Sequence, residues 1–511
     1  MSGPAVLSSG EAGVSSRPGL LYFVAAMLAG AVATFAFAPF DVYVLAPVAL
    51  AVLAAMSRRV QGARATAALG FAWGLGTFLV GVSWLYVALN RYGGMPMPFA
   101  ALAILLLCAY LALFPALALG LFGRFASGGT ARRAALFAGL WAASEILRGW
   151  LFTGFPWLAI GYSQTPPSPF AGFLPVLGVY GVGALLAFCA AMAGLSEWRN
   201  GRSAGLTLAV LTLIVGAGTG LRSVGWTAPT GEPIQVALVQ TNVEQGLKWR
   251  PETLAEQLDS NARLALAKRA DLVVLPETTV PMLADRLPRG YVEELAAQIR
   301  SRGGDLVLGV FLRDAGEHIY NAALSLGRSP SQTYAKQHLV PFGEYSPPLF
   351  GWFYRLADIP MSDQTRGAPN QPPLRLGDQR VAVNICYEDL FGRELIRSLP
   401  EATLMLNMSN LAWYGDSFAQ PQHLQIARVR ALETGRPMLR STNTGMTAVV
   451  QPDGRVTEVL PAFEQGILSA SVRGYQGLTP YGRWGDAAAL LLALAAISAS
   501  VLPALRRRKK G

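Results

Sequence analysis

Cysteine and histidine are scarce in this chain, which has 511 residues and only three of each. Cys108 and Cys189 lie inside apolar runs, where cysteine usually behaves as a small buried hydrophobic residue. Cys386 is the one cysteine of the polar middle stretch, so a disulfide framework is excluded there. The histidines are scattered at positions 318, 338 and 423, without the Cys/His spacing of a zinc site. We therefore expect no metal centre.

Charged residues are also few. They make up 14% of the chain, whereas 52% of the residues are hydrophobic and the mean hydropathy is +0.36. This balance is typical of a protein that lies partly in lipid rather than of a soluble enzyme. The apolar residues crowd into 20–221 and 486–505, and the stretch between them has an ordinary soluble composition. Because the chain is also too long for one ordinary domain, we expect two units.

The net charge of +11 could suggest a nucleic-acid partner, but its distribution argues against one. Arg and Lys cluster in short loops beside apolar runs and in the C-terminal tail at 506–510. That distribution is the pattern of membrane topology. We therefore expect the membrane, and no nucleic acid, as a partner.

The apolar runs predict about eight transmembrane helices, since about 20 apolar residues cross the hydrocarbon core. They are expected at 20–38, 43–57, 67–89, 99–123, 134–150, 171–196, 206–221 and 486–504. The first run could instead be a cleaved signal peptide, because Ala36-Phe37-Ala38 resembles a cleavage site. Its poor basic region and the runs that follow at once favour a retained helix.

Basic residues set the expected orientation. They follow the second, fourth and sixth runs, at Arg58, Arg59, Arg64, Arg124, Arg132, Arg133, Arg199 and Arg202. This pattern places both termini in the cytoplasm and the stretch after the seventh span outside. We thus expect a transmembrane domain with seven helices at 1–225, an extracytoplasmic domain at 226–482, and a C-terminal transmembrane helix with a basic cytoplasmic tail at 483–511.

The extracytoplasmic stretch alternates expected strands and helices. Strands are predicted at 234–240, 271–275, 305–311, 380–385 and 403–408, helices at 251–269, 288–302 and 418–435, and a late hairpin at 447–450 and 456–460. This alternation indicates a layered α/β sandwich.

Glu277, Lys336 and Cys386 stand at the ends of strands or just beyond them. Strand ends lie at the rim of a sheet, where sites are commonly assembled. A carboxylate can take a thiol proton, and an ammonium can stabilise both a thiolate and an oxyanion, so this set is sufficient for acyl transfer. Each residue also has a plainer interpretation: Cys386 as packing, Glu277 as a helix cap and Lys336 as a solvated side chain. Composition and spacing alone leave both interpretations open.

A set of motifs favours the catalytic interpretation. They are QGLKW (245–249), LPET (275–278), KQHLVPFGEYSP (336–347), ICYED (385–389), MSNLAWYG (408–415), RALETGRP (430–437) and RSTNTG (440–445). The stretch that carries them resembles the nitrilase, or carbon–nitrogen hydrolase, superfamily. Together with the membrane unit, the chain resembles the apolipoprotein N-acyltransferase family over nearly its whole length. Leu411 departs from the family pattern, in which an acidic residue follows the asparagine.

The resemblance implies a nitrilase-like αββα sandwich on a multi-span membrane unit, with a Glu-Lys-Cys triad. Glu277 would be the general base, Lys336 the stabiliser of thiolate and oxyanion, and Cys386 the nucleophile. The residues with supporting or substrate-binding roles would be Trp249, Asn321, Glu344, Tyr387 and Glu388. His338, two residues from Lys336, is expected to be loop structure.

The reaction that the resemblance implies has two steps and needs neither a metal nor an organic cofactor. Cys386 would take an acyl chain from a phospholipid, with phosphatidylethanolamine as the expected donor, and form a thioester. The α-amine of the diacylglyceryl-cysteine of an apolipoprotein would then take the chain, which matures the lipoprotein. Such an enzyme would lie in the bacterial inner membrane, with a periplasmic catalytic domain and both termini in the cytoplasm.

Two other functions remain open. A membrane-tethered amidase or nitrilase would keep the triad but would not require so many spans. A transporter or receptor with an external binding domain would carry charges along its spans, and the spans have few besides Glu145 and Arg148.

The segment 346–361 is unusually apolar for a part of the chain that faces solvent. It contains Phe350, Trp352, Phe353 and Tyr354. These side chains could pack into the core, but aromatic residues are favoured at the membrane interface. We therefore expect a lid that admits acyl chains toward Cys386.

Overall fold

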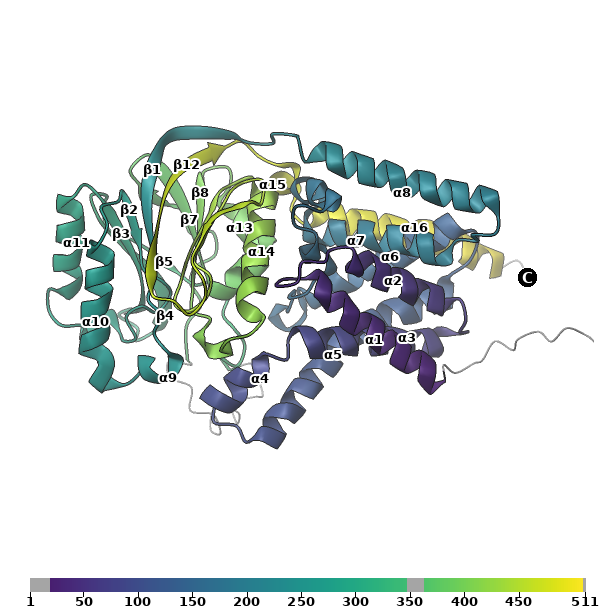
Figure 1. Ribbon diagram of the computed structural model, residues 1–511, viewed down its shortest axis with the longest axis horizontal. Coiled ribbons are helices and arrows are strands. Elements are labelled where there is room, and N and C mark those ends of the chain that lie inside the picture. Colours follow the sequence, from purple (N-terminus) through teal and green to yellow (C-terminus); the bar gives the residue numbers. More distant parts are fainter. Residues whose placement is uncertain (1–18, 347–362, 509–511) are drawn as a thin grey trace, which may run out of the picture.

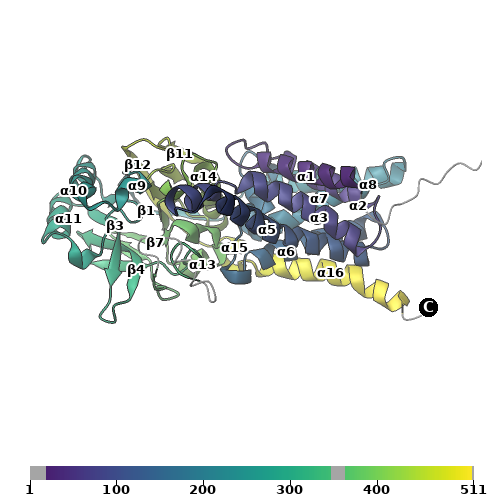
Figure 2. The same ribbon diagram turned by 90° about the horizontal axis from the view of Figure 1, so that it is seen from below.

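The computed structural model describes residues 19–346 and 363–508, which form two units (Figure 1). One unit is a bundle of apolar helices, and the other is a sandwich of two β-sheets flanked by helices. Figure 2 shows the sandwich at one end of the bundle, so that the bundle helices run along the length of the molecule.

Helices are present at all the positions where the sequence predicts spans. They are α1 (Leu20–Ala33), α2 (Leu45–Ser57), α3 (Ala63–Gly81), α5 (Met97–Phe125), α6 (Thr130–Arg148), α7 (Leu174–Leu195), α8 (Gly201–Leu221) and α16 (Ala487–Arg508), with the short α4 (Leu85–Val87) before α5. By length and composition, four described helices could cross a membrane: Ala63–Gly81, Met97–Phe125, Pro169–Leu195 and Gly201–Leu221.

The remaining predicted spans are less clear. Leu20–Ala36, Leu45–Ser57 and Ala487–Leu502 are apolar but shorter. Helix α6 carries four charged residues, which are Arg132, Arg133, Glu145 and Arg148. The structure therefore supports a multi-span helical unit but not clearly eight spans.

Glycines let α1 and α3 approach each other closely. A Cβ added at Gly30 would lie 1.9 Å from the Trp73 carbonyl oxygen, and one at Gly76 would lie 1.9 Å from the Met27 carbonyl oxygen. The Thr77 hydroxyl donates to the Gly30 carbonyl at 2.9 Å across the same contact. Small residues and such hydrogen bonds hold helices together in lipid, where hydrophobic burial does not drive them together.

The sandwich contains two six-stranded sheets, with the strand orders β12-β1-β2-β3-β4-β5 and β11-β10-β9-β8-β7-β6. The strands are β1 (Ala228–Gln240), β2 (Leu272–Val274), β3 (Asp305–Arg313), β4 (Ile319–Gly327), β5 (Gln332–Ala335), β6 (Leu374–Leu376), β7 (Gln379–Ile385), β8 (Leu404–Ser409), β9 (Met438–Thr442), β10 (Ala448–Val450), β11 (Val456–Val459) and β12 (Gly466–Gln476). The central strands of each sheet are parallel, and their apolar runs are buried.

Helices cover the outer face of each sheet (Figure 1). On the first sheet, α10 (Pro251–Leu266) and α11 (Tyr291–Ser301) share a buried cluster with β1, β2 and β3. On the second sheet, α14 (Ala419–Thr434) and the short α13 (Gly392–Leu395) share a cluster with β7, β8 and β9. A third cluster fills the space between the sheets. The layers therefore run helix, sheet, sheet, helix.

The strands and helices expected in this stretch are all present, although β1 begins at Ala228 rather than at 234. The sequence prediction missed β4, β5, β6, β9 and β12. Strand β9 was missed because its residues Arg440, Ser441 and Thr442 are polar, although they are fully buried in polar contacts. A buried strand with polar side chains lacks the apolar run by which such strands are recognised.

Helix α14 also connects the sandwich to the bundle. Its Glu433 carboxylate accepts the N–H of Val179 in α7 at 2.7 Å. Its Arg430 guanidinium donates to the Tyr162 hydroxyl at 2.7 Å. All of these side chains are buried, so polar contacts of one helix fix the sandwich on the bundle.

Candidate active site

Three strand ends supply the chemically reactive side chains. Glu277 follows β2, Lys336 directly follows β5, and Cys386 directly follows β7. Strands β2 and β5 belong to one sheet and β7 to the other. The site therefore combines strand ends from both sheets of the sandwich. This is the placement at strand ends that the sequence predicted.

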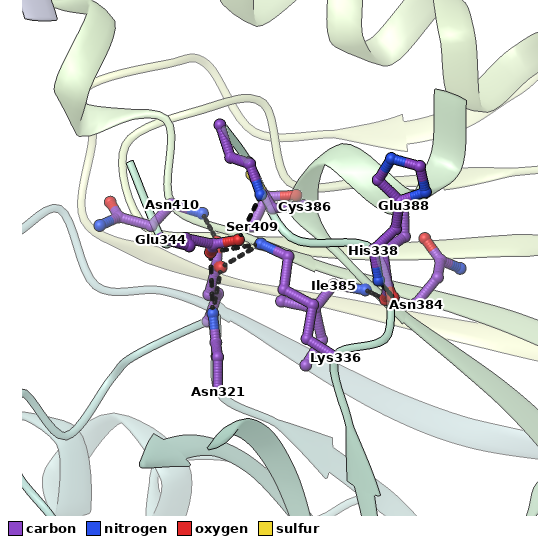
Figure 3. A network of polar contacts seen from close by, with 12 residues as sticks. Asn321, Lys336, His338, Glu344, Asn384, Ile385, Cys386, Glu388, Ser409 and Asn410 are labelled. Carbon is purple, nitrogen blue, oxygen red and sulfur yellow. Dashed lines mark hydrogen bonds and ion pairs between the residues drawn. The ribbon is translucent and has the colours of Figure 1, made fainter. Parts of the chain in front are cut away.

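Lys336 lies at the centre of a buried ion cluster (Figure 3). Its ammonium contacts Glu277 Oε1 at 3.2 Å and Glu344 Oε1 at 2.6 Å, and its side chain is only 1% exposed. Asn321 Nδ2 donates to Glu277 Oε1 at 2.8 Å, and the backbone N–H of Asn410 donates to Glu277 Oε2 at 2.7 Å. Both oxygens of Glu277 are therefore held in place.

Burial and the charges of the cluster together set the pKa values of Lys336 and of the Cys386 thiol. Burial alone would lower the pKa of Lys336, but the carboxylates of Glu277 and Glu344 raise it well above its usual value, so this residue is an ammonium. Burial raises the pKa of the Cys386 thiol well above its usual value; negative Glu277 adds to this rise and Lys336 opposes it. A thiol with a pKa raised in this way needs a base to form the thiolate, which is the form that attacks carbonyl groups.

Cys386 is the first residue of the 3₁₀ helix η7 (Cys386–Leu390), at a sharp turn directly after β7. Its φ is +54°, in the left-handed region that costs a residue with a Cβ about 1–2 kcal/mol. The Glu388 carboxylate holds the turn, because it accepts the N–H groups of Ile385 at 2.6 Å, Gln337 at 2.8 Å and His338 at 3.0 Å. Burial raises the pKa of Glu388 to about 7, although these N–H donors oppose the rise.

Sequence analysis did not single out Asn407, His423 and Asn410, which are among the residues that contact Glu277 or Cys386. Asn407 Nδ2 lies 3.1 Å and His423 Nε2 lies 3.3 Å from the Cys386 carbonyl oxygen. Asn410 binds Glu277 through its backbone N–H, which no side-chain pattern reveals, although the motif MSNLAWYG points to the segment. The place of His423 depends on how α14 packs against η7, which the sequence alone does not reveal.

The other expected site residues have different surroundings. Tyr387 donates its hydroxyl to the Gly154 carbonyl of the membrane unit at 2.8 Å. The Trp249 indole packs against Phe311, with ring centroids 5.9 Å apart. His338, expected as loop structure, stacks on a phenylalanine of the turn after η7 at a centroid distance of 3.6 Å.

The expected lid residues Phe350, Trp352, Phe353 and Tyr354 lie outside the described residues. Among the residues that the structure describes, no group of three or more His, Cys, Asp or Glu side chains could hold a metal ion.

Two family models match the chain. The apolipoprotein N-acyltransferase N-terminal domain matches residues 29–192, and carbon-nitrogen hydrolase matches residues 235–481. A relative from Nitrosomonas europaea with the name apolipoprotein N-acyltransferase is 46% identical, over 96% of this chain and 99% of its own length. This chain belongs to the apolipoprotein N-acyltransferase family.

Other members of the apolipoprotein N-acyltransferase family match to a similar extent. The Chromobacterium violaceum protein is 43% identical over 96% of this chain and 95% of its own. A solved carbon-nitrogen hydrolase from Helicobacter pylori G27 is 19% identical, covers 47% of this chain and 89% of that chain, and has a TM-score of 0.36.

As a family member with a carbon-nitrogen hydrolase domain and apolar helices, the protein is a multi-pass membrane acyltransferase. The alternatives of a membrane-tethered amidase or nitrilase and of a transporter or receptor are not favoured.

Proposed function

We propose that this enzyme moves a fatty acyl chain from a phospholipid to the N-terminal amine of a diacylglyceryl-cysteine apolipoprotein, through a thioester on Cys386. The observation that carries the proposal is the buried Lys336 ammonium between Glu277 and Glu344, beside the Cys386 thiol, whose pKa is raised and which lies on a strained turn. The names of the relatives support the substrate class.

In the first step, Glu277 takes the Cys386 proton and the thiolate attacks the ester carbonyl of the phospholipid. Lys336 and the Tyr387 N–H stabilise the negative oxygen of the tetrahedral intermediate. The C–O bond then breaks, Glu277 returns the proton to the leaving oxygen, and a lysophospholipid departs. Phosphatidylethanolamine is the donor that we expect.

In the second step, the amine of the apolipoprotein attacks the thioester. Glu277 takes a proton from the amine, the C–S bond breaks, and the proton returns to the sulfur, so that an amide and the free thiol result. The supporting roles follow from the contacts. Glu344 and Asn321 hold Lys336 and Glu277, and Glu388 holds the turn of the nucleophile.

We place the enzyme in the bacterial inner membrane, with eight spans and a periplasmic sandwich. The domains would be 1–225 in the membrane, 226–482 outside, and 483–511 as a last span with a cytoplasmic tail. Two observations support this topology. Helix α1 begins and α16 ends at the end of the bundle far from the sandwich (Figure 2), and the C-terminal tail is basic.

The test uses purified full-length protein in lipid vesicles that contain phosphatidylethanolamine with a labelled acyl chain. We expect a protein-bound label that hydroxylamine removes and that an apolipoprotein with a diacylglyceryl-cysteine discharges. Cys386→Ser should lose the hydroxylamine-sensitive label, whereas Cys189→Ala should keep it. Discharge to water alone, without amide formation on the apolipoprotein, would favour a hydrolase and overturn the proposal.

A further inference from the structure

The peptide bond after Cys386 links the nucleophile to an oxyanion donor. This bond is trans, so the Cys386 carbonyl and the Tyr387 N–H lie in one plane and point in opposite directions. Tyr387 is the second residue of η7, and the first N–H groups of a helix have no acceptor within it. Any group that fixes the carbonyl therefore also fixes the direction of this N–H.

His423 shares one N–H between Asp389 and this carbonyl, which is the more distant acceptor, and its surroundings determine which ring nitrogen carries the hydrogen. Nε2 lies 2.8 Å from Asp389 Oδ1 and 3.3 Å from the Cys386 carbonyl oxygen. Both partners are acceptors, so Nε2 carries a hydrogen. Nδ1 lies 3.0 Å from Arg440 Nη2, which can only donate, so Nδ1 carries none. His423 is thus the neutral Nε2–H tautomer, and burial lowers its pKa in agreement.

A closed network holds the imidazole and the carbonyl together. Arg440 Nη1 donates to Asp389 Oδ2 at 3.1 Å and to Asn407 Oδ1 at 3.2 Å. Asn407 Nδ2 in turn donates to the Cys386 carbonyl at 3.1 Å. His423 is 1% exposed, and Asp389 and Arg440 are 0% exposed. A buried charged network of this kind is not needed for packing, because apolar side chains would fill the same space without the desolvation cost.

The membrane unit contributes the surface against which the imidazole rests. The Trp157 ring stacks on His423 with a centroid distance of 5.7 Å and an angle of 20° between the planes. The Trp157 indole also donates to Gln422, the neighbour of His423 in α14, at 2.7 Å. The ring of His423 is therefore fixed by hydrogen bonds at its edge and by an indole on its face.

We infer that His423 is a positioning residue for acyl transfer. By holding the Cys386 carbonyl, it aims the Tyr387 N–H at the developing oxyanion, and Asp389, Arg440 and Trp157 fix its tautomer and its ring. No proton moves through His423 in this role. The inference rests on the proposed function, in which Cys386 is the nucleophile.

Two matched substitutions test the role. Glutamine can place an amide N–H near the position of imidazole Nε2, whereas the shorter asparagine reaches only the position of Nδ1. We expect His423→Gln to form the thioester within about threefold of the wild-type rate, and His423→Asn to form it about tenfold more slowly or worse, with the phospholipid KM unchanged, because a misaimed oxyanion donor affects the transition state alone. Equal rates for the two variants, or a change confined to KM, would overturn the inference.

A measurement on the unmodified protein does not depend on the folding of a variant. The chain has only three histidines, so ¹⁵N-histidine spectra of the full-length enzyme in detergent can be assigned, with His423→Gln removing one signal set. We expect His423 to stay the neutral Nε2–H tautomer between about pH 6 and 8, where an exposed histidine titrates. An Nδ1–H tautomer, or protonation in this range, would contradict the inference. Neither result bears on whether Cys386 carries the acyl chain, which the labelling experiment decides separately.

Discussion

The substitution Lys336→Met removes the cation at the centre of the ion cluster and keeps a side chain of similar length. It leaves the carboxylates of Glu277 and Glu344, whose side chains are 5% and 12% exposed, next to each other without a counter-charge. Breaking a buried ion pair in this way costs about 3–5 kcal/mol of folding free energy. Removing an oxyanion stabiliser also lowers the rate of the chemical step by about 100-fold to 1000-fold.

The double substitution Lys336→Met/Glu344→Gln separates these two effects. It removes one negative charge together with the positive one, so the net charge of the cluster returns to that of the wild type. We expect it to recover much of the lost stability, because only one buried carboxylate then lacks the ammonium, while thioester formation stays as slow as in Lys336→Met.

The assays are the midpoint of thermal unfolding in detergent and the single-turnover rate of thioester formation from labelled phospholipid. Glu344→Gln alone serves as the control for the loss of the second carboxylate. If Lys336→Met formed the thioester at the wild-type rate, Lys336 would not act on the oxyanion or the thiolate. If the double variant recovered the rate together with the stability, the loss in the single variant would be a folding effect, and the catalytic role of the ammonium would be refuted.

The remaining predictions concern the nucleophile, the base and a buried lysine. Cys386→Ala should abolish transfer of the acyl chain while the protein still inserts and unfolds normally, and Cys189→Ala should change neither; triacylated lipoprotein from the first variant would exclude the thioester route. Glu277→Gln should slow thioester formation about 100-fold or more without weakening phospholipid binding, because glutamine cannot accept the thiol proton; a normal burst of acyl-enzyme would show that another group is the base. Lys248 is buried, and burial lowers its pKa to about 7. Between the lowered pKa of the folded state and the ordinary pKa of an exposed lysine, Lys248 is protonated in the unfolded chain but neutral in the folded protein. The free energy of unfolding should therefore rise by about 2 kcal/mol from about pH 7.5 to pH 9. Lys248→Met should lack this rise, and parallel stability curves for the two proteins would contradict the explanation.

The parts of the sandwich that the sequence predicted have continuous apolar runs. The apolar residues of DLVVL before Glu277 and of RVAVNI before Cys386 lie in strands and are buried, so the ends of these strands could be placed from the sequence. Strand β9 could not, because Arg440 replaces the apolar side chain that a buried strand normally has, and its charge is balanced by Asp389 from a distant part of the chain. Polar residues that are buried together form hydrogen bonds with one another only in the folded state, so no local sequence pattern predicts their burial.

In the candidate site, too, some residues could be predicted from the sequence and others could not. The motifs contain Glu277, Lys336 and Glu344, and the resemblance added Asn321; the structure brings these four residues into contact. The backbone N–H of Asn410 and the imidazole of His423 were missed, because one is a group that every non-proline residue carries and the other depends on the rotation of α14. The roles of the triad residues stay predictions until the variants are measured.

The pairing of β1 with β12 has a consequence for how the sandwich is connected to the helices. These strands are antiparallel neighbours, and Ala228 lies opposite Gln476. The chain thus enters the sandwich from α8 and leaves it toward α16 on adjacent strands, about 5 Å apart. A folded domain whose two ends lie side by side can be inserted into a loop without separating the flanking segments. The connection between α8 and α16 can therefore hold a whole folded domain while the two helices remain where a short loop would hold them.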